Sequence, residues 1–253
     1  MPDRSLASRP KTSAAPQNPA PRARRNIARE VALALRTDII SGRLRPGSPL
    51  AEPVLAKLFG SSRAPIREAL IELEREGLVQ FQTTGRTKVR SFTETDFAEI
   101  RDARVALESM AARRAAENWT PADTAFIERN IEAQSKASTL AELSRLDIEL
   151  HEYVMKHSDN KRLLALWQSV RWQFEMCLAT THRLQQNLAF KPRNISVVSH
   201  RRLLAALASG KPALAAETMA SHIEGSMEWS SSYHDSDEDN APSAAAAQAN
   251  ARP

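Results

Sequence analysis

The second half of this chain contains four residues of types that bind divalent metal ions, at positions that suit helices. Asp147 and His151 lie four positions apart, so a helix would carry both side chains on one face. His200 and His222 lie on two further stretches, each aligned with apolar residues at helical spacing. One carboxylate and three imidazoles suit a zinc, nickel, cobalt or manganese ion. The residue types therefore indicate a divalent metal site.

The spacing alone leaves other interpretations open. Asp147 and His151 can form an exposed ion pair on one helix, and isolated histidines are usually hydrogen-bonded core residues. A bound metal ion can also activate water, which makes a metal-dependent hydrolase the alternative function. The helical region contains no obvious residue placed as a general base, which disfavours that alternative.

The elements that must position these residues are helices. Only 7 glycines and 5% aromatic residues argue against a β-rich fold. Periodicity and the breaks at proline and glycine predict helices near 94–117, 121–135, 139–156, 160–184, 193–209 and 211–230. The fold class is therefore mainly α, and residues 94–232 are expected to form an all-helical bundle for ligand sensing and dimerisation.

Residues 26–91 show a different pattern. Apolar residues around Leu55 predict a short helix, Gly60 a turn, and the stretch up to Gly77 a second helix. Two short strands joined by a turn at 83–86 are expected to follow as a wing. The pattern predicts a winged helix-turn-helix DNA-binding domain.

The N-terminal turn of this second helix and the tip of the wing carry the side chains that suit DNA. A helix N-terminus and serine hydroxyls can hold phosphate, and arginine pairs bidentately with guanine. Arginine and lysine on the wing can reach phosphate or the minor groove. The predicted DNA contacts are Ser62, Arg63, Ala64, Pro65, Arg67, Thr83, Thr84, Arg86 and Lys88.

Composition agrees with a DNA partner. The formal net charge of +5 mildly favours a polyanion. No apolar stretch approaches the about 20 residues that span a bilayer, and the first residues lack a secretory signal, so a cytoplasmic protein with no membrane partner is expected. Residues 1–25 and 233–253 lack apolar periodicity and are predicted to be a disordered basic arm and a disordered tail. The single cysteine, Cys177, is expected to be a core thiol.

Three N-terminal motifs together resemble the GntR family of repressors. They are IISGRLRPG from Ile39, SRAPIREAL from Ser62 and LEREGLV from Leu73. In that family, the residues that match Ser62, Arg63, Pro65 and Arg67 lie at the DNA interface. Downstream, the sequence resembles the FCD ligand-binding domain of the FadR subfamily, and six expected helices are similar to its VanR-like branch.

The resemblance implies a ligand-responsive regulator. All four positions of the family's metal motif are present, at Asp147, His151, His200 and His222. Family members often have a pocket-facing arginine where this chain has Arg104, which implies a two-pronged clamp for a small carboxylate effector. The guanidinium of Arg171 is a second candidate for this contact.

The expected partner of the N-terminal domain is double-stranded DNA with a near-palindromic operator, which a homodimer would bind. Effector binding would alter operator affinity by shifting the two wings. An architectural DNA-binding protein, whose helical domain only dimerises, is the third functional class left open.

Overall fold

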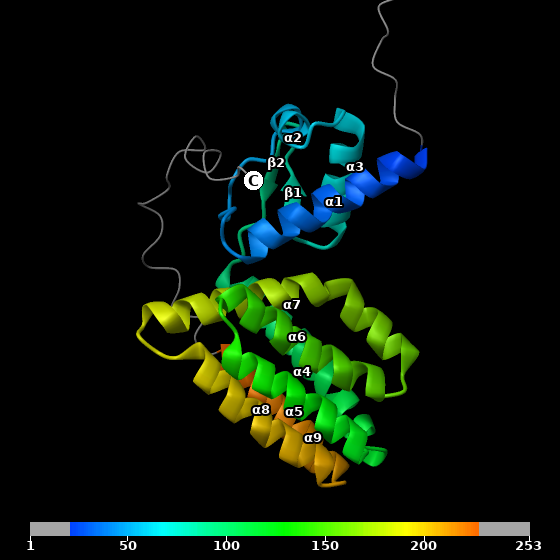
Figure 1. Cartoon of the computed structure of the whole chain (residues 1–253), viewed down its shortest axis with the longest axis vertical. Helices are drawn as coiled ribbons and strands as arrows, with labels where there is room; N and C mark the ends of the chain where they lie inside the picture. Colours follow the sequence, from blue (N-terminus) through cyan, green and yellow to red (C-terminus); the bar gives the residue numbers. More distant parts are fainter. Residues whose placement is uncertain (1–20, 228–253) are drawn as a thin grey trace, which may run out of the picture.

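The computed structural model describes residues 21–227 and contains two packed parts, which Figure 1 shows one above the other. The expected tail lies outside the described residues. Residues 1–20 of the expected arm do too, and helix α1 begins at Pro21, within the range predicted for the arm. The helices of the upper part are α1 (Pro21–Ile40), α2 (Glu52–Leu58) and α3 (Arg63–Arg75), and its strands are β1 (Val79–Phe81) and β2 (Thr87–Val89).

The upper part is a winged helix-turn-helix, as the sequence predicts. Helix α3 packs on α1 and α2, and its Ile66, Leu70 and Leu73 are fully buried. Gly60 turns the chain between α2 and α3 with a positive φ of 58°, a conformation that glycine adopts at no steric cost. The antiparallel hairpin of β1 and β2, with Val79 opposite Val89, follows α3 as the wing.

The lower part is a helical bundle. Its helices are α4 (Glu94–Glu117), α5 (Pro121–Lys136), α6 (Leu140–His157), α7 (Lys161–Asn187), α8 (Pro192–Ala208) and α9 (Pro212–Met227). Thr93 and Thr120 begin α4 and α5 with reciprocal capping hydrogen bonds, and the Asn160 side chain caps α7. These local signals explain why the helix boundaries fall within a few residues of the predicted ones. The mainly α fold class is confirmed.

The interior of the bundle is closely packed. Trp167 and Phe174 of α7 are fully buried, and so is Cys177, as predicted; burial raises the pKa of its thiol far above the usual range. Helices α4 and α9, the first and last of the bundle, pack against each other more extensively than any other pair of described elements. Of the helices described, none is long and apolar enough to cross a bilayer.

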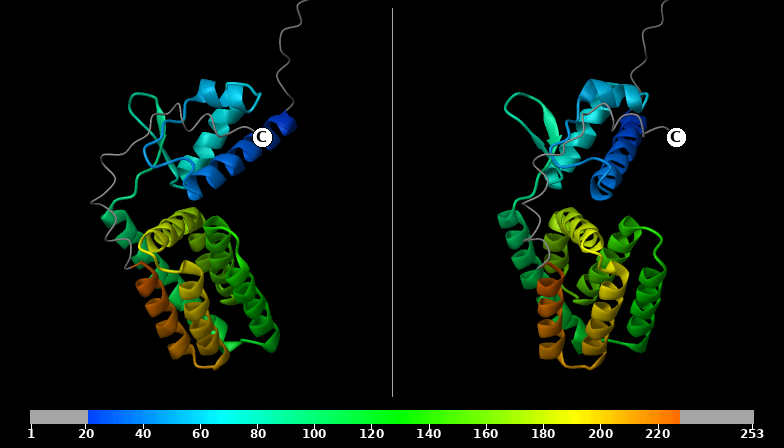
Figure 2. Two further views of the ribbon diagram at one scale, coloured as in Figure 1. Left: turned by 60° about the vertical axis from the view of Figure 1, so that its left-hand side comes forward. Right: turned by 90° about the vertical axis from the view of Figure 1, so that its left-hand side faces the viewer.

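Helix α7 is the part of the bundle that faces the winged domain (Figure 2). The Arg183 guanidinium donates a hydrogen bond of 2.6 Å to the carbonyl oxygen of Ile40, the last residue of α1. The Arg36 guanidinium of α1 lies 4.3 Å from the ring centroid of Trp172. The two parts of the molecule are therefore joined through side chains of α7 as well as through the connecting chain.

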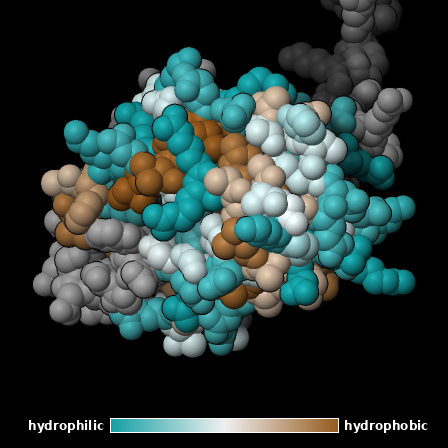
Figure 3. Space-filling model, turned by 90° about the horizontal axis from the view of Figure 1, so that it is seen from below, coloured by the Kyte–Doolittle hydropathy of each residue, from teal (hydrophilic) through white to brown (hydrophobic). Residues whose placement is uncertain are grey.

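Seen from the end away from the winged domain, the surface of the bundle alternates between hydrophobic and hydrophilic residues (Figure 3). Hydrophobic residues gather above the centre of this view (Figure 3), and hydrophilic side chains cross the patch. The features that suggest binding lie in the interior and on one side of the bundle instead.

Candidate metal centre and DNA-binding surface

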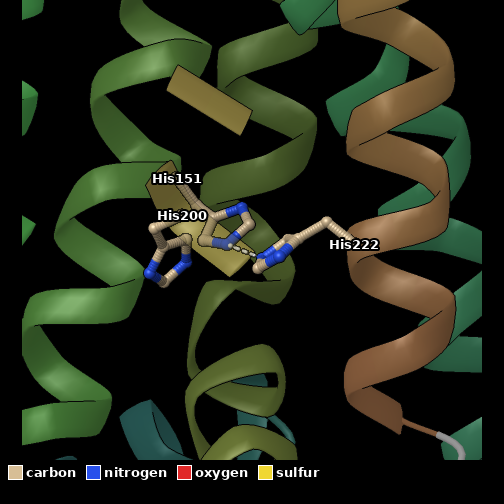
Figure 4. A group of neighbouring side chains, drawn as sticks. All are labelled: His151, His200 and His222. Atoms are coloured by element: carbon tan, nitrogen blue, oxygen red, sulfur yellow. Dashed lines mark hydrogen bonds between the residues drawn. The ribbon is translucent and has the colours of Figure 1, made fainter. Parts of the chain in front are cut away.

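Three imidazole rings from three helices converge inside the bundle. His151 comes from α6, His200 from α8 and His222 from α9, and Figure 4 shows their rings turned toward one another. One ring nitrogen of each lies within 4.8 Å of the others. The Nε2 atoms of His151 and His222 are 3.1 Å apart. Two ring nitrogens this close need a proton or a cation between them, because two facing lone pairs repel each other.

Each ring is oriented by a hydrogen bond at its other nitrogen, Nδ1. The partner of His151 is a Glu108 carboxylate oxygen at 2.5 Å. The partner of His200 is the Gln134 amide oxygen at 2.8 Å, and that of His222 is a serine hydroxyl, Ser199, at 2.6 Å. Metal-binding histidines usually have an outer hydrogen bond of this kind, which fixes the ring and the tautomer.

The Gln134 side chain leaves little freedom in the orientation of His200. Nε2 of Gln134 donates to the side-chain oxygen of Asn130 at 2.7 Å, and the Asn130 amide donates to the carbonyl oxygen of Leu146 at 3.0 Å. The remaining amide oxygen of Gln134 must then accept from Nδ1–H of His200. Consequently Nε2 of His200 carries a lone pair and faces the centre of the cluster.

Asp147 completes the cluster. Its carboxylate oxygens lie 3.4 Å from Nε2 of His151 and 3.5 Å from Nε2 of His200. Asp147 is only 3% exposed, which overturns the interpretation of an exposed ion pair. Its Oδ1 atom and Nε2 of His200 are buried without a hydrogen-bond partner. Unpaired buried atoms of these two types are what a cation would bind, so the residues fit a divalent metal ion.

The electrostatics of the cluster also suit a cation. Burial raises the pKa of Asp147, but the nearby His200 and His151 hold it below its usual range, so the carboxylate is ionised. Burial lowers the pKa of His200 to about 4 and that of His222 well below its usual value. Both rings are therefore neutral near pH 7, the form in which imidazole binds metals.

Glu108 is a buried residue that the sequence pattern did not single out. Burial raises the pKa of its carboxyl, but Arg104 and His151 together hold it well below the usual range. Nε of Arg104 and the indole N–H of Trp167 each donate to Oε1 at 2.9 Å. The feature of the sequence that could have revealed Glu108 is its four-residue spacing from Arg104 on one helix.

Neither arginine predicted to hold an effector lines the pocket that lies beside the histidine cluster. Arg104 is 1% exposed and engaged with Glu108. Arg171 lies over the ring of Trp172, on the side of α7 that meets the winged domain. The effector contacts of both residues stay predictions, and the structure gives each of them another partner.

The pocket beside the cluster has a volume of about 480 Å³ and lies between α7, α8 and α9. Asp147 and His222 form part of its wall, and Arg202 of α8 is the arginine that lines it. Sequence reasoning missed Arg202, although Ser199 and Arg202 are three residues apart on one helix and so lie on the same face. The other polar wall residues are Thr181, His182, Gln185, Ser196, Glu217, Thr218, Ser221 and Ser226.

The predicted DNA contacts lie mostly on the outside of the winged domain. Arg63 and Arg67 are exposed on the first turns of α3, and Ser62 before them is exposed and makes no side-chain capping bond. Pro65 is an exception, because it is buried in the domain core and cannot be on the solvent side as expected. Ala64 is less exposed than Arg63 and Arg67, so it lies at the edge of the surface that they form.

On the wing, Thr83, Thr84 and Arg86 are exposed around the turn, as a contact to DNA requires. Lys88 is half-buried within β2, where it pairs with Gln80, so it lies along the strand and not at the tip. Contacts of these residues with DNA stay predictions.

Two family models match the chain. The model described as "Bacterial regulatory proteins, gntR family" matches residues 27–89, and the FCD domain model matches residues 99–225, half of the chain. The two matches fall inside the predicted DNA-binding and helical ranges.

Several known proteins are similar to this one. YdhC of Bacillus subtilis (strain 168), an uncharacterized HTH-type transcriptional regulator, is 31% identical over 56% of this chain and 66% of its own length. The probable D-xylose utilization operon transcriptional repressor of Paenarthrobacter nicotinovorans is 28% identical over 79% of this chain and 87% of its own length. The solved structure of E. coli McbR/YncC covers 82% of this chain and 98% of that chain, with a TM-score of 0.66 at 22% identity, a likeness of fold.

These matches extend over both parts of the molecule and agree with the winged helix-turn-helix and the helical bundle. They support neither a hydrolase nor any other enzyme. The chain therefore belongs to the GntR family of bacterial transcriptional regulators, with a helix-turn-helix DNA-binding domain followed by an FCD domain.

Proposed function

We propose that this regulator is a repressor whose FCD domain binds a divalent metal ion through Asp147, His151, His200 and His222, and a small carboxylate effector beside it. The observation that carries the proposal is the convergence of the inner atoms of these residues, while each histidine is held at its outer nitrogen. A core built only for packing would pair these polar atoms with one another or with the backbone.

When bound, the metal ion would supply a positive charge that anchors a carboxylate oxygen of the effector. Arg202 would contribute a second positive charge on the pocket wall, and a guanidinium fits a carboxylate well. We assign the cationic side of the pocket to Arg202, since Arg104 is already paired with Glu108.

At the other end of the molecule, a homodimer would place the N-terminal turns of two α3 helices in successive major grooves of a near-palindromic operator in the cytoplasm. Exposed Arg63 and Arg67 would contact bases or phosphates. Effector binding would change the operator affinity through α7, which lines the pocket and contacts the winged domain. The relative from Paenarthrobacter nicotinovorans is named for a sugar utilization operon, which supports a small metabolite as effector.

The test is elemental analysis of the full chain, purified without a metal-binding tag, beside His200→Ala and His157→Ala. We expect near-stoichiometric metal in the wild type and in His157→Ala, because His157 bonds to Asp123 and Tyr153 away from the cluster. The His200→Ala variant should lose most of the metal and respond less to acids in operator titrations. Full metal content in His200→Ala would contradict the proposed ligand set.

A further inference from the structure

Apart from Asp147, two residues of the pocket wall have a buried polar atom without a hydrogen-bond partner. The atoms are Oγ1 of Thr181 and Oε1 of Gln185. The two residues are 1% and 2% exposed, and both line the pocket. They lie four positions apart on α7, so they occupy the same face of that helix. The pair forms a short row of unsatisfied groups along one side of the pocket.

Several other polar groups on this wall or next to it are paired within the protein. Nδ1 of His182 lies 2.9 Å from the Ser144 hydroxyl, and the hydroxyl of Ser199 lies 2.6 Å from Nδ1 of His222. The hydroxyl of Thr180, next to Thr181, donates to the carbonyl oxygen of Met176 at 2.9 Å. On this wall, Thr181 and Gln185 share the lack of partners with Asp147, the proposed metal ligand, whose Oδ1 is also unpaired.

A buried hydroxyl or amide oxygen without a partner costs stability, because it has lost its water and gained nothing in return. Such groups persist where a ligand pairs with them. The two residues on α7 line the pocket beside the proposed metal site, so a molecule bound in the pocket is the partner that we infer for these two atoms.

The atom types define the chemistry of that molecule. The Gln185 amide oxygen only accepts hydrogen bonds, so an ionised carboxylate cannot pair with it but a hydroxyl group can. The Thr181 hydroxyl pairs with a hydroxyl group as donor or as acceptor. An ammonium group would also donate, but Arg202 and the proposed metal ion would repel it, whereas Glu217 on the same wall would attract it. A neutral hydroxyl group donates without this conflict of charges.

On the basis of the proposed function, which places a carboxylate at the metal ion, we propose that the effector is a hydroxylated carboxylic acid whose hydroxyl groups bind Thr181 and Gln185. A volume of about 480 Å³ has room for an acid of several carbon atoms. Thr181 and Gln185 are then the residues that distinguish hydroxylated carboxylic acids from carboxylic acids without hydroxyl groups.

The first test needs no knowledge of the effector. Thr181→Val replaces the hydroxyl by a methyl group of similar shape, and Thr180→Val is the matched control with a bonded hydroxyl. In the absence of acids, we expect Thr181→Val to melt at the wild-type temperature or above it. Thr180→Val should melt roughly 2–4 °C lower, the shift for losing about one hydrogen bond in a protein of this size. A drop in Thr181→Val as large as that in Thr180→Val would overturn the proposal.

The second test uses calorimetric titration of the metal-loaded full chain with two matched pairs of acids, hexanoate with gluconate and butyrate with threonate. We expect the hydroxylated member of at least one pair to bind about tenfold more tightly, the value of one good hydrogen bond. Thr181→Val combined with Gln185→Leu should remove most of that preference without changing the metal content.

Equal or tighter binding of the plain acids, or a preference that survives in the double variant, would overturn the role of Thr181 and Gln185 and leave the metal site standing. Failure of all four acids to bind the metal-loaded protein would overturn the carboxylate pocket and this inference with it. A wild-type protein that takes up no metal would instead contradict the proposed function, and the melting test would still decide whether Thr181 is an unpaired group.

Discussion

At the scale of single residues, the candidate metal centre depends as much on the outer partners as on the proposed ligands. Glu108 holds Nδ1 of His151 and is itself held by Arg104 and Trp167, all buried. The orientation of His151 therefore rests on a carboxylate that touches neither the pocket nor the proposed metal ion. A change at Glu108 acts on metal binding only through His151.

Glu108→Gln keeps the shape of the side chain and removes its charge. We expect metal affinity to fall by about 10–100-fold, the usual effect of losing such an outer partner. Unfolding free energy without metal should fall by about 3–5 kcal/mol, because the buried guanidinium of Arg104 loses its counter-charge. Competition with a chromophoric chelator measures the metal affinity, and urea unfolding measures the free energy of unfolding.

Glu132→Gln, which removes the charge from an exposed pair with Lys136, is the control. Unchanged metal affinity in a folded Glu108→Gln protein would contradict the positioning role.

The four proposed ligands could be predicted from the sequence, and their partners could not. Asp147 and His151 share a helix, and His200 and His222 fall on apolar stripes, so local spacing was enough. Gln134 and Glu108 lie 66 and 43 positions from the histidines that they orient. Only the packing of separate helices brings them together. Arg104 differs, because its partner Glu108 lies four positions away on the same helix and the spacing already indicated the pair.

At the scale of elements, helix boundaries were predictable because capping residues, prolines and glycines act locally. The arrangement of the helices was not, because it depends on contacts between distant segments. The end of α3 illustrates the difference. Gly77 was expected to end the helix, and it does so with a positive φ of 73°. Its close approach to Gln173 of α7 had no signal in the sequence.

Gly77→Ala should destabilise the protein for two reasons. A side chain in this conformation costs about 1–3 kcal/mol, and the added Cβ would lie 2.6 Å from Nε2 of Gln173. Gly210→Ala is the matched control, with a φ of 65° and no atom within 4 Å of its Cβ. We expect urea unfolding to show a larger loss for Gly77→Ala than for Gly210→Ala, and Gln173→Ala to remove the difference. Equal losses would mean that the contact with α7 is unimportant.

At the scale of the whole molecule, Trp172 links the helical bundle and the winged domain. Its ring lies 4.3 Å from the guanidinium of Arg171 and 4.3 Å from that of Arg36. Arg36 in turn donates to Glu76, directly after α3, at 2.9 and 2.6 Å. A displacement of α7 at the pocket can therefore be transmitted through Trp172 and Arg36 to Glu76, at the C-terminal end of α3. Helix α3 is the one proposed to enter DNA.

Trp172→Ala should uncouple the two parts while leaving each one functional. We expect metal content to stay at the wild-type level, because Trp172 lies outside the cluster. The ratio of operator affinities with and without the tightest-binding acid of the panel should fall toward one, since the link from α7 to Arg36 is lost. Fluorescence anisotropy with labelled operator DNA measures this ratio. Trp119→Ala, which removes a partly buried ring that contacts Tyr153 away from the winged domain, is the control. A wild-type ratio in Trp172→Ala would exclude this route.

The extensive contact between α4 and α9 has a consequence for synthesis on the ribosome. Buried alanines of α4 (Ala111, Ala112 and Ala115) face the bundle interior, whose last helix is α9. A nascent chain completes the DNA-binding domain early, but it holds an unfinished bundle with exposed apolar surface until α9 has emerged. His222, the last of the three converging histidines, arrives with that helix. The helix-turn-helix is therefore complete before the candidate metal centre, and chaperones have this interval in which to bind the unfinished bundle.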